Sequence, residues 1–195
     1  MEGIFFCYSP TMTDLISAAL ANPINRAILT RLPMLGAPDA WLVAGSIYQA
    51  YWNALGGQPV TAGVKDYDIF YYDPSDLSYE AEDAVVRRAA MVFADLDGLI
   101  DLKNQARVHL WYKDRFGADW PPVASAKESI GRFQVRCTCV GLQPKADGTL
   151  ELHAPYGLDE LTRGELRANL NCPNAAGITA KSESYRERWP WLRIV

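Results

Sequence analysis

Two aspartates separated by a single tyrosine are the residues of this sequence best placed to do chemistry. Asp66 and Asp68 stand at the start of the run Tyr67–Tyr72, which has the composition of a β-strand. Side chains two apart on a strand point to the same face of the sheet. Two carboxylates about 4 Å apart repel by roughly 4 kcal/mol near a protein surface, and Mg²⁺ would remove that repulsion. The pair therefore indicates a metal site, although solvated strand edges and turns have the same spacing.

Two further features favour the metal site. Asp101 lies between Ile100 and Leu102 in a second short apolar segment, where a carboxylate is costly unless it is paired or at the end of the sheet. Gly45 and Ser46 stand where an apolar strand gives way to a helical pattern. Their N–H groups could bind a phosphate there, and a helix simply capped by Ser46 is the alternative.

Polar residues near these acids are candidates for binding a nucleotide. Lys65, Lys103 and Arg107 could neutralise a triphosphate, or they could form ordinary salt bridges with the acids. Asn104 is explained equally well as a helix cap and as a ligand contact.

Aromatic residues gather in two places. Trp111, Tyr112 and Trp120 could stack on a nucleobase, although packing in the core or in loops is the commoner role for such residues. A basic and aromatic tail could contact RNA or a partner, but we expect it to dock on the body of the domain. The tail comprises Arg186, Arg188, Trp189, Trp191 and Arg193.

Alternating strand and helix patterns must position these residues. Thr13 is expected to cap the first helix. Strands are expected at 41–44, 67–72, 99–102, 136–143 and 149–153. Helices are expected at 14–21, 47–55, 105–116, 125–133, 158–167 and 179–189, with two more that begin at Pro23 and after Ser78. This alternation predicts an α/β or α+β domain.

The composition limits the possible classes of protein. The 195 residues are 49% hydrophobic, enough for one sizeable core. The net charge of −4 argues against a single basic face that binds a long duplex. The four cysteines have no zinc-site spacing. The run Ile4–Tyr8 is a poor signal peptide, and no apolar run reaches about 18 residues. We therefore expect a cytoplasmic protein with no membrane partner.

The order of these motifs resembles a known superfamily. A Gly-Ser turn, an Asp-x-Asp strand and a carboxylate on a neighbouring strand are similar to the nucleotidyltransferase superfamily that includes DNA polymerase β. Three stretches resemble a bacterial nucleotidyltransferase-like family more specifically, and the similarity runs from about Trp41 to Trp189. These stretches are KDYD at 65–68, DPSDLSYEAEDA at 73–84 and KNQARVHLWY at 103–112.

The resemblance implies an α+β fold, with a nucleotidyltransferase-type mixed β-sheet flanked by helices. We expect one domain over 1–195, with N-terminal helices at 13–32, a core at about 40–155 and a C-terminal helical piece at 156–195. By the resemblance, Asp66, Asp68 and Asp101 would be catalytic and would hold Mg²⁺ or Mn²⁺. The nucleotide-binding candidates would be Gly45, Ser46, Lys65, Lys103, Asn104 and Arg107.

The implied reaction moves a nucleoside monophosphate from a nucleoside triphosphate to an acceptor hydroxyl. The acceptor could be a small molecule, RNA or a protein. Two departures bear on the site: nineteen residues separate Ser46 from Asp66, more than the superfamily pattern usually shows, and Asp101 stands where relatives tend to carry Glu. The alternative is a non-catalytic nucleotide-binding or regulatory module on the same fold.

Overall fold

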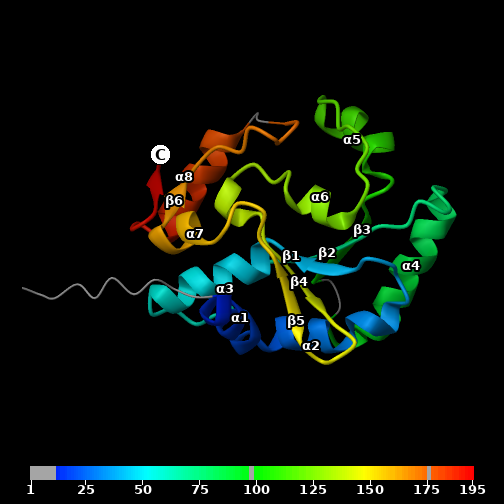
Figure 1. Cartoon of the computed structure of the whole chain (residues 1–195), viewed down its shortest axis with the longest axis horizontal. Helices are drawn as coiled ribbons and strands as arrows, with labels where there is room; N and C mark the ends of the chain where they lie inside the picture. Colours follow the sequence, from blue (N-terminus) through cyan, green and yellow to red (C-terminus); the bar gives the residue numbers. More distant parts are fainter. Residues whose placement is uncertain (1–11, 97–98, 175–176) are drawn as a thin grey trace, which may run out of the picture.

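A five-stranded mixed sheet forms the centre of the molecule (Figure 1). The computed structural model describes residues 12–96, 99–174 and 177–195, so the run at 4–8 lies outside the described residues. The strands are β1 (Trp41–Val43), β2 (Tyr67–Tyr71), β3 (Ile100–Asn104), β4 (Gly141–Pro144) and β5 (Leu150–His153). Their order is β3-β2-β1-β4-β5, and β2 and β3 are parallel whereas the other pairs are antiparallel. The predicted α+β class is confirmed.

The two faces of β2 have different roles. Tyr67, Ile69 and Tyr71 are buried in the hydrophobic core. Asp68 and Phe70 alternate with them and are half-buried on the opposite face. Strand alternation thus buries the apolar side chains and leaves the carboxylate on the face toward the C-terminal half of the chain.

The N-terminal helices support the strand-to-helix turn after β1. The helices are α1 (Met12–Ala21) and α2 (Pro23–Arg31). The Asn22 side chain caps α2 by accepting the N–H groups of Ile24 and Asn25. Asn25 Nδ2 donates to the carbonyl of Ser46 at 3.0 Å, which ties α2 to the start of α3 (Gly45–Leu55). α1 begins at Met12, two residues before the expected bound at position 14, and the side chain of Thr13 lies outside what the structure describes.

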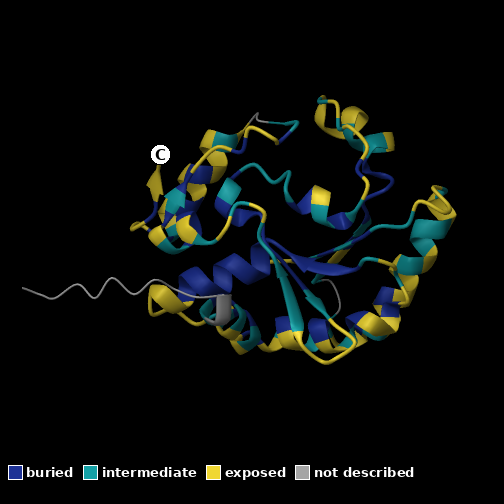
Figure 2. Ribbon diagram, in the orientation of Figure 1, coloured by how far each residue is buried: buried dark blue, intermediate teal, exposed yellow. Residues whose placement is uncertain are grey.

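The basic and aromatic tail docks on α3, as expected. It comprises the end of α8 (Ile178–Arg188) and the residues after that helix. Trp189 is 1% exposed, and its indole N–H donates to Asn53 Oδ1 at 3.0 Å. The Trp189 and Trp52 ring centroids are 5.1 Å apart. Figure 2 shows the buried residues concentrated in α3 and the central strands. The tail therefore completes the core.

Several predicted elements have different bounds, β3 among them, and for the three that follow the difference has a local physical cause. The expected strand at 136–143 is the 3₁₀ turn η3 (Arg136–Thr138) followed by β4. α5 (Val108–Phe116) starts later than expected because the N–H of Gln105 still donates to the carbonyl of Tyr71, at 2.7 Å. α7 (Asp159–Arg163) ends early because Gly164 adopts a φ of 67°.

The remaining elements are helical segments around the sheet and a separate two-stranded parallel sheet of β6 and β7. They are η1 (Leu32–Leu35), α4 (Tyr79–Val92), η2 (Ala94–Leu96), α6 (Ala126–Ile130), β6 (Glu165–Leu166) and β7 (Arg193–Ile194). α6 is shorter than the expected helix at 125–133 because Gly131 caps it. In Figure 1, α5, α6 and α8 lie on one side of the sheet and α1 and α2 on the other. None of the helices in the described ranges has the length and apolar character needed to cross a bilayer.

Candidate functional site

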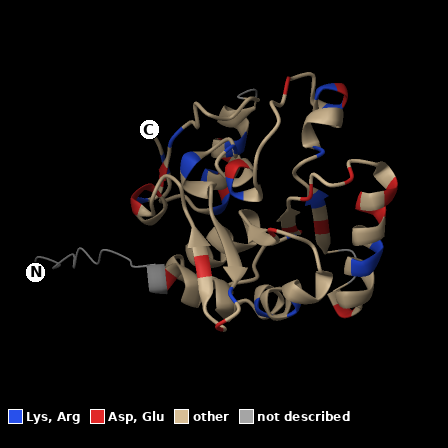
Figure 3. Ribbon diagram, turned by 45° about the vertical axis from the view of Figure 1, so that its right-hand side comes forward, with Lys and Arg blue, Asp and Glu red and all other residues tan. Residues whose placement is uncertain are grey.

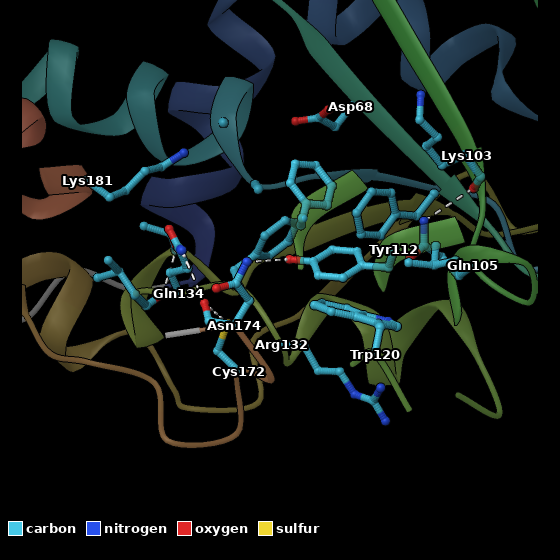
Figure 4. A pocket seen from close by; sticks show the side chains of 18 of the residues that line it. Asp68, Lys103, Gln105, Tyr112, Trp120, Arg132, Gln134, Cys172, Asn174 and Lys181 are labelled. Atoms are coloured by element: carbon cyan, nitrogen blue, oxygen red, sulfur yellow. Dashed lines mark hydrogen bonds between the residues drawn. The ribbon is translucent and has the colours of Figure 1, made fainter. Parts of the chain in front are cut away.

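A cavity of about 580 Å³ lies between the polar face of β2 and β3 and the C-terminal half of the chain (Figure 4). Four groups of residues line it. The start of α3 and the residue before it contribute Ala44, Gly45, Tyr48 and Gln49. β2 with the residue before it, and β3 with the residue after it, contribute Asp66, Asp68, Phe70, Lys103 and Gln105. The segment around α5 contributes Val108, Trp111, Tyr112, Phe116 and Trp120. The last group is Arg132, Phe133, Gln134, Val135, Thr138, Cys172, Asn174, Lys181 and Tyr185.

The two aspartates of the Asp-x-Asp motif both line this cavity, as their spacing predicts. Asp66 is exposed, and Asp68 is half-buried. Burial, and after it the negative charges of Asp66 and Asp101, raise the pKa of Asp68 to about 6. The positive charges near Asp68 therefore do not offset the cost of ionising its carboxyl group.

The third carboxylate is adjacent in the sheet but is engaged elsewhere. Asp101 is the Cα partner of Asp68 in the parallel β2–β3 pairing. Its side chain forms an ion pair with Lys103 and is half exposed, and it is not among the described residues that line the cavity. Within the described ranges, no three His, Cys, Asp or Glu side chains form a ready-made metal site. The structure thus brings Asp66 and Asp68 together and leaves Asp101 paired with a lysine.

Lys181 of α8 is a residue that the sequence analysis missed. It lines the cavity, and its charge lowers the pKa of Asp68, as does that of Lys103. Figure 4 shows the Lys181 side chain extending toward Asp68. No local signal could have identified it, because a lysine among charged helix residues is ordinarily a solvated one. A cation therefore reaches the acidic site from a segment more than a hundred residues away in the chain.

The turn before α3 is strained. Ala44 has φ 48° and ψ −108°, a conformation that L-residues rarely adopt. Gly45 follows it, and a Cβ at this position would lie 3.2 Å from Gln49 Nε2. Gly45 lines the cavity, whereas Ser46 is fully buried and its Oγ has no hydrogen-bond partner in the described part of the chain. The N–H groups of Ile47 and Tyr48 donate to the carbonyl of Ala44, whereas the N–H of Gly45, the first residue of α3, has no acceptor within the helix.

Three other predicted nucleotide-binding residues lie outside the cavity. Lys65 is exposed and is not among the described lining residues. Asn104 Nδ2 donates to the carbonyl of Asp73 at 2.9 Å, and its Oδ1 accepts the N–H of Asp73. Arg107 forms a buried ion pair with Glu82 of α4. Asn104 and Arg107 thus hold β3 to its neighbours.

Four aromatic residues form one end of the cavity, which we call the aromatic chamber: Trp111, Tyr112, Phe116 and Trp120. The Tyr112 and Trp120 ring centroids are 4.5 Å apart at an interplanar angle of 34°. Phe116 is 50% exposed, which is high for a large apolar side chain. These rings form a wall on the cavity in addition to packing on one another.

Comparisons with known proteins agree with this geometry. A sequence profile for a family described as nucleotidyltransferase matches residues 30–194. A solved structure described as a CCA-adding enzyme head domain matches with a TM-score of 0.73 and 25% identity, covering 95% of this chain and 96% of that chain. No curated protein sequence matches. The two matches confirm the resemblance drawn from the sequence.

Proposed function

The chain belongs to the nucleotidyltransferase family, and from that premise we propose that it moves a nucleoside monophosphate from a nucleoside triphosphate to an acceptor hydroxyl, using a divalent metal ion. One observation carries the proposal. A single cavity joins the Asp66–Asp68 pair, the start of α3 and Lys181. These groups match the needs of a metal–triphosphate complex: hard oxygen ligands, N–H donors and a cation.

The residues present fit Mg²⁺ or Mn²⁺. Asp68 is half-buried beside two like charges; burial and, after it, their repulsion raise its pKa to about 6, and a divalent cation would remove the repulsion. Mg²⁺ commonly uses one or two carboxylates and completes its shell with substrate phosphates and water. Asp66 and Asp68 would supply those carboxylates, and Asp101 could join them once Lys103 releases it. When bound, the metal supplies charge neutralisation on the phosphates.

The chain's own residues orient the substrates. The N–H group of Gly45 and the ammonium of Lys181 would bind the β- and γ-phosphates. In the reaction, the acceptor oxygen forms a bond to the α-phosphorus, and the bond from that phosphorus to the bridging oxygen breaks. Pyrophosphate leaves with the electron pair, and the hydroxyl proton passes to a carboxylate of the site. Lys181 would stabilise the charge that develops on the leaving group.

Titration calorimetry and a transfer assay test this proposal. We expect each nucleoside triphosphate to bind more tightly with Mg²⁺ than without it, and Asp68→Asn to abolish that metal dependence. Lys181→Met should weaken triphosphate binding by about tenfold, the effect of losing one charge-assisted contact. Arg186→Met is the matched control, since Arg186 lies on the same helix and pairs with Glu183. Full transfer activity in Asp68→Asn would refute the assignment.

A non-catalytic nucleotide-binding module is the second candidate. The observation in its favour is the ion pair between Asp101 and Lys103, which engages the third carboxylate with a lysine although it lies next to Asp68 in the sheet. Such a module would bind a nucleotide with Mg²⁺ and release no product with any acceptor. Pyrophosphate release in the transfer assay distinguishes the two functions.

A further inference from the structure

Asp68 lies on the middle strand of three, so different groups of the cavity lie on either side of it. β2 lies between β1 and β3. Gly45 follows β1 at the start of α3, whereas the aromatic chamber follows β3 on α5 and the loop after it. Figure 4 shows Lys181 to one side of Asp68, and Tyr112 and Trp120 across the cavity from it. The phosphate-binding groups and the aromatic rings therefore flank the carboxylates from different directions.

If the chain has the proposed function, this arrangement indicates the side from which the acceptor approaches and its chemical class. In phosphoryl transfer the attacking and leaving oxygens lie roughly in line with the phosphorus between them. Pyrophosphate held by Gly45 and Lys181 leaves toward α3 and α8, so the acceptor approaches from the β3 side. We propose that the acceptor is a small hydroxylated molecule with a planar ring, and that its ring stacks in the aromatic chamber.

The chamber is organised in advance for a planar ring. Trp120 lies between Tyr112 and the guanidinium of Arg132, which sits 5.6 Å from the Trp120 ring centroid (Figure 4). Asn174 Nδ2 donates to the hydroxyl of Tyr112 at 3.3 Å. These contacts hold Tyr112 from below and at its tip, so its ring presents a fixed surface to the cavity. A rigid aromatic surface binds a flat ring at low entropic cost.

Charges around the chamber argue against a polynucleotide end. Lys113 pairs with Asp119 at 2.8 Å, and Arg132 pairs with Glu128. Figure 3 shows acidic and basic residues interspersed in this view, with no continuous basic band. Single-stranded nucleic acid needs a positive groove along its backbone in addition to stacking rings. The chamber has the rings, but Lys113 and Arg132 beside it are paired with acids, which leaves Arg115, 5.3 Å from the Phe116 ring centroid, as a single cation rather than part of a positive groove.

The volume of the cavity also favours a small molecule as the acceptor. The whole cavity is about 580 Å³, within the range of sites that hold one drug-sized ligand. A nucleoside triphosphate would fill much of it. The acceptor portion that enters the chamber must therefore be small, about the size of one or two rings.

The test uses the purified 195-residue chain, Mg²⁺ and α-labelled nucleoside triphosphates with three acceptor pools from a cell extract: small metabolites, RNA and protein. We expect label in the small-metabolite pool, on a compound that mass spectrometry shows to contain a planar ring. Trp111→Leu and Tyr112→Leu should each lower kcat/KM for that acceptor by at least about tenfold, as loss of stacking predicts. Triphosphate affinity should remain within about twofold.

Leu110→Ala is the matched control, because Leu110 lies on the same helix, is 52% exposed and is not among the lining residues. Thermal melts of every variant establish that it folds. Label confined to RNA or protein, or on an acyclic acceptor, overturns the inference. So does a loss of triphosphate affinity in both chamber variants, which would place the nucleobase there. Absence of triphosphate binding in the wild type would overturn the proposed function as well. This result is distinct from failure of the acceptor inference alone, in which the triphosphate still binds.

Discussion

At the scale of single residues, Asp68 shows a conflict between folding and function. The carboxylate is placed where burial and two neighbouring acids disfavour its charge. A protein under selection for stability alone would not gain from this arrangement. Sites that bind cations commonly bear such a cost, and the bound ion offsets it.

We therefore predict that Asp68→Asn stabilises the protein in the absence of metal. A pKa raised from 3.8 to about 6 corresponds to roughly 3 kcal/mol as an upper limit. Because the folded-state pKa lies above the unfolded value, wild type is most stable when this group is protonated and loses that contribution as pH rises through about 6. The advantage of Asp68→Asn should be full at about pH 8 and vanish below about pH 4.

Chemical unfolding in EDTA across this pH range measures the difference. Adding Mg²⁺ should stabilise wild type more than the variant, and so reduce the difference between their free energies of unfolding. An advantage of Asp68→Asn that stays constant with pH would contradict the electrostatic cause.

At the scale of elements, β3 is an edge strand that depends on α4. Glu82 of α4 accepts the backbone N–H of Asn104 at 2.8 Å and pairs with Arg107. Arg107 Nε also donates to the carbonyl of Leu77 at 2.9 Å. The side chains of Arg107 and Glu82 are 11% and 13% exposed. This network closes the sheet edge next to the candidate site without facing the cavity.

Arg107→Met should destabilise the fold by about 3–5 kcal/mol, because it leaves Glu82 buried without a counter-charge. The double variant Arg107→Met with Glu82→Gln should recover part of that loss, since no uncompensated charge remains. Denaturant unfolding measures both. Triphosphate affinity of the folded protein should not change. A variant with wild-type stability and lost triphosphate affinity would instead show that Arg107 is a ligand contact.

At the scale of the whole molecule, the C-terminal piece is one wall of the cavity and part of the core. Trp189 packs on Trp52 of α3, and the hydroxyls of Tyr48 and Tyr185 lie 2.7 Å apart. Arg188 donates to Gln49 Oε1 at 2.7 Å. These contacts attach α8 to α3, and α8 carries Lys181.

Trp189→Leu should cost about 3 kcal/mol through the volume lost in the core. It should also raise the KM for the nucleoside triphosphate several-fold, because α8 is less firmly positioned. Trp191→Leu is the comparison: Trp191 is 37% exposed, so its loss should cost less. Unfolding curves and steady-state kinetics on both variants give the two effects. An unchanged KM in a destabilised Trp189→Leu would show that α8 does not position the substrate.

Local sequence patterns were enough for the strands and for the direction of the two aspartates. Alternation along Tyr67–Tyr71 puts Asp68 opposite the buried tyrosines, and Asp66 follows from the same period of two. The start of β4 is an exception, because the 3₁₀ turn η3 occupies the first part of the expected strand. The presence of the strands and the face on which Asp68 lies depend on residues close in the chain, so the sequence by itself determined them.

Tertiary packing alone decided which groups meet the aspartates. Lys181 reaches Asp68 from α8, Arg107 turns to Glu82, and Asp101 pairs with Lys103. The same long-range packing makes the aromatic residues near α5 a wall of the cavity. A sequence pattern fixes the face on which a side chain lies. It does not fix its partner, because that depends on how distant elements dock and on which charges burial forces together.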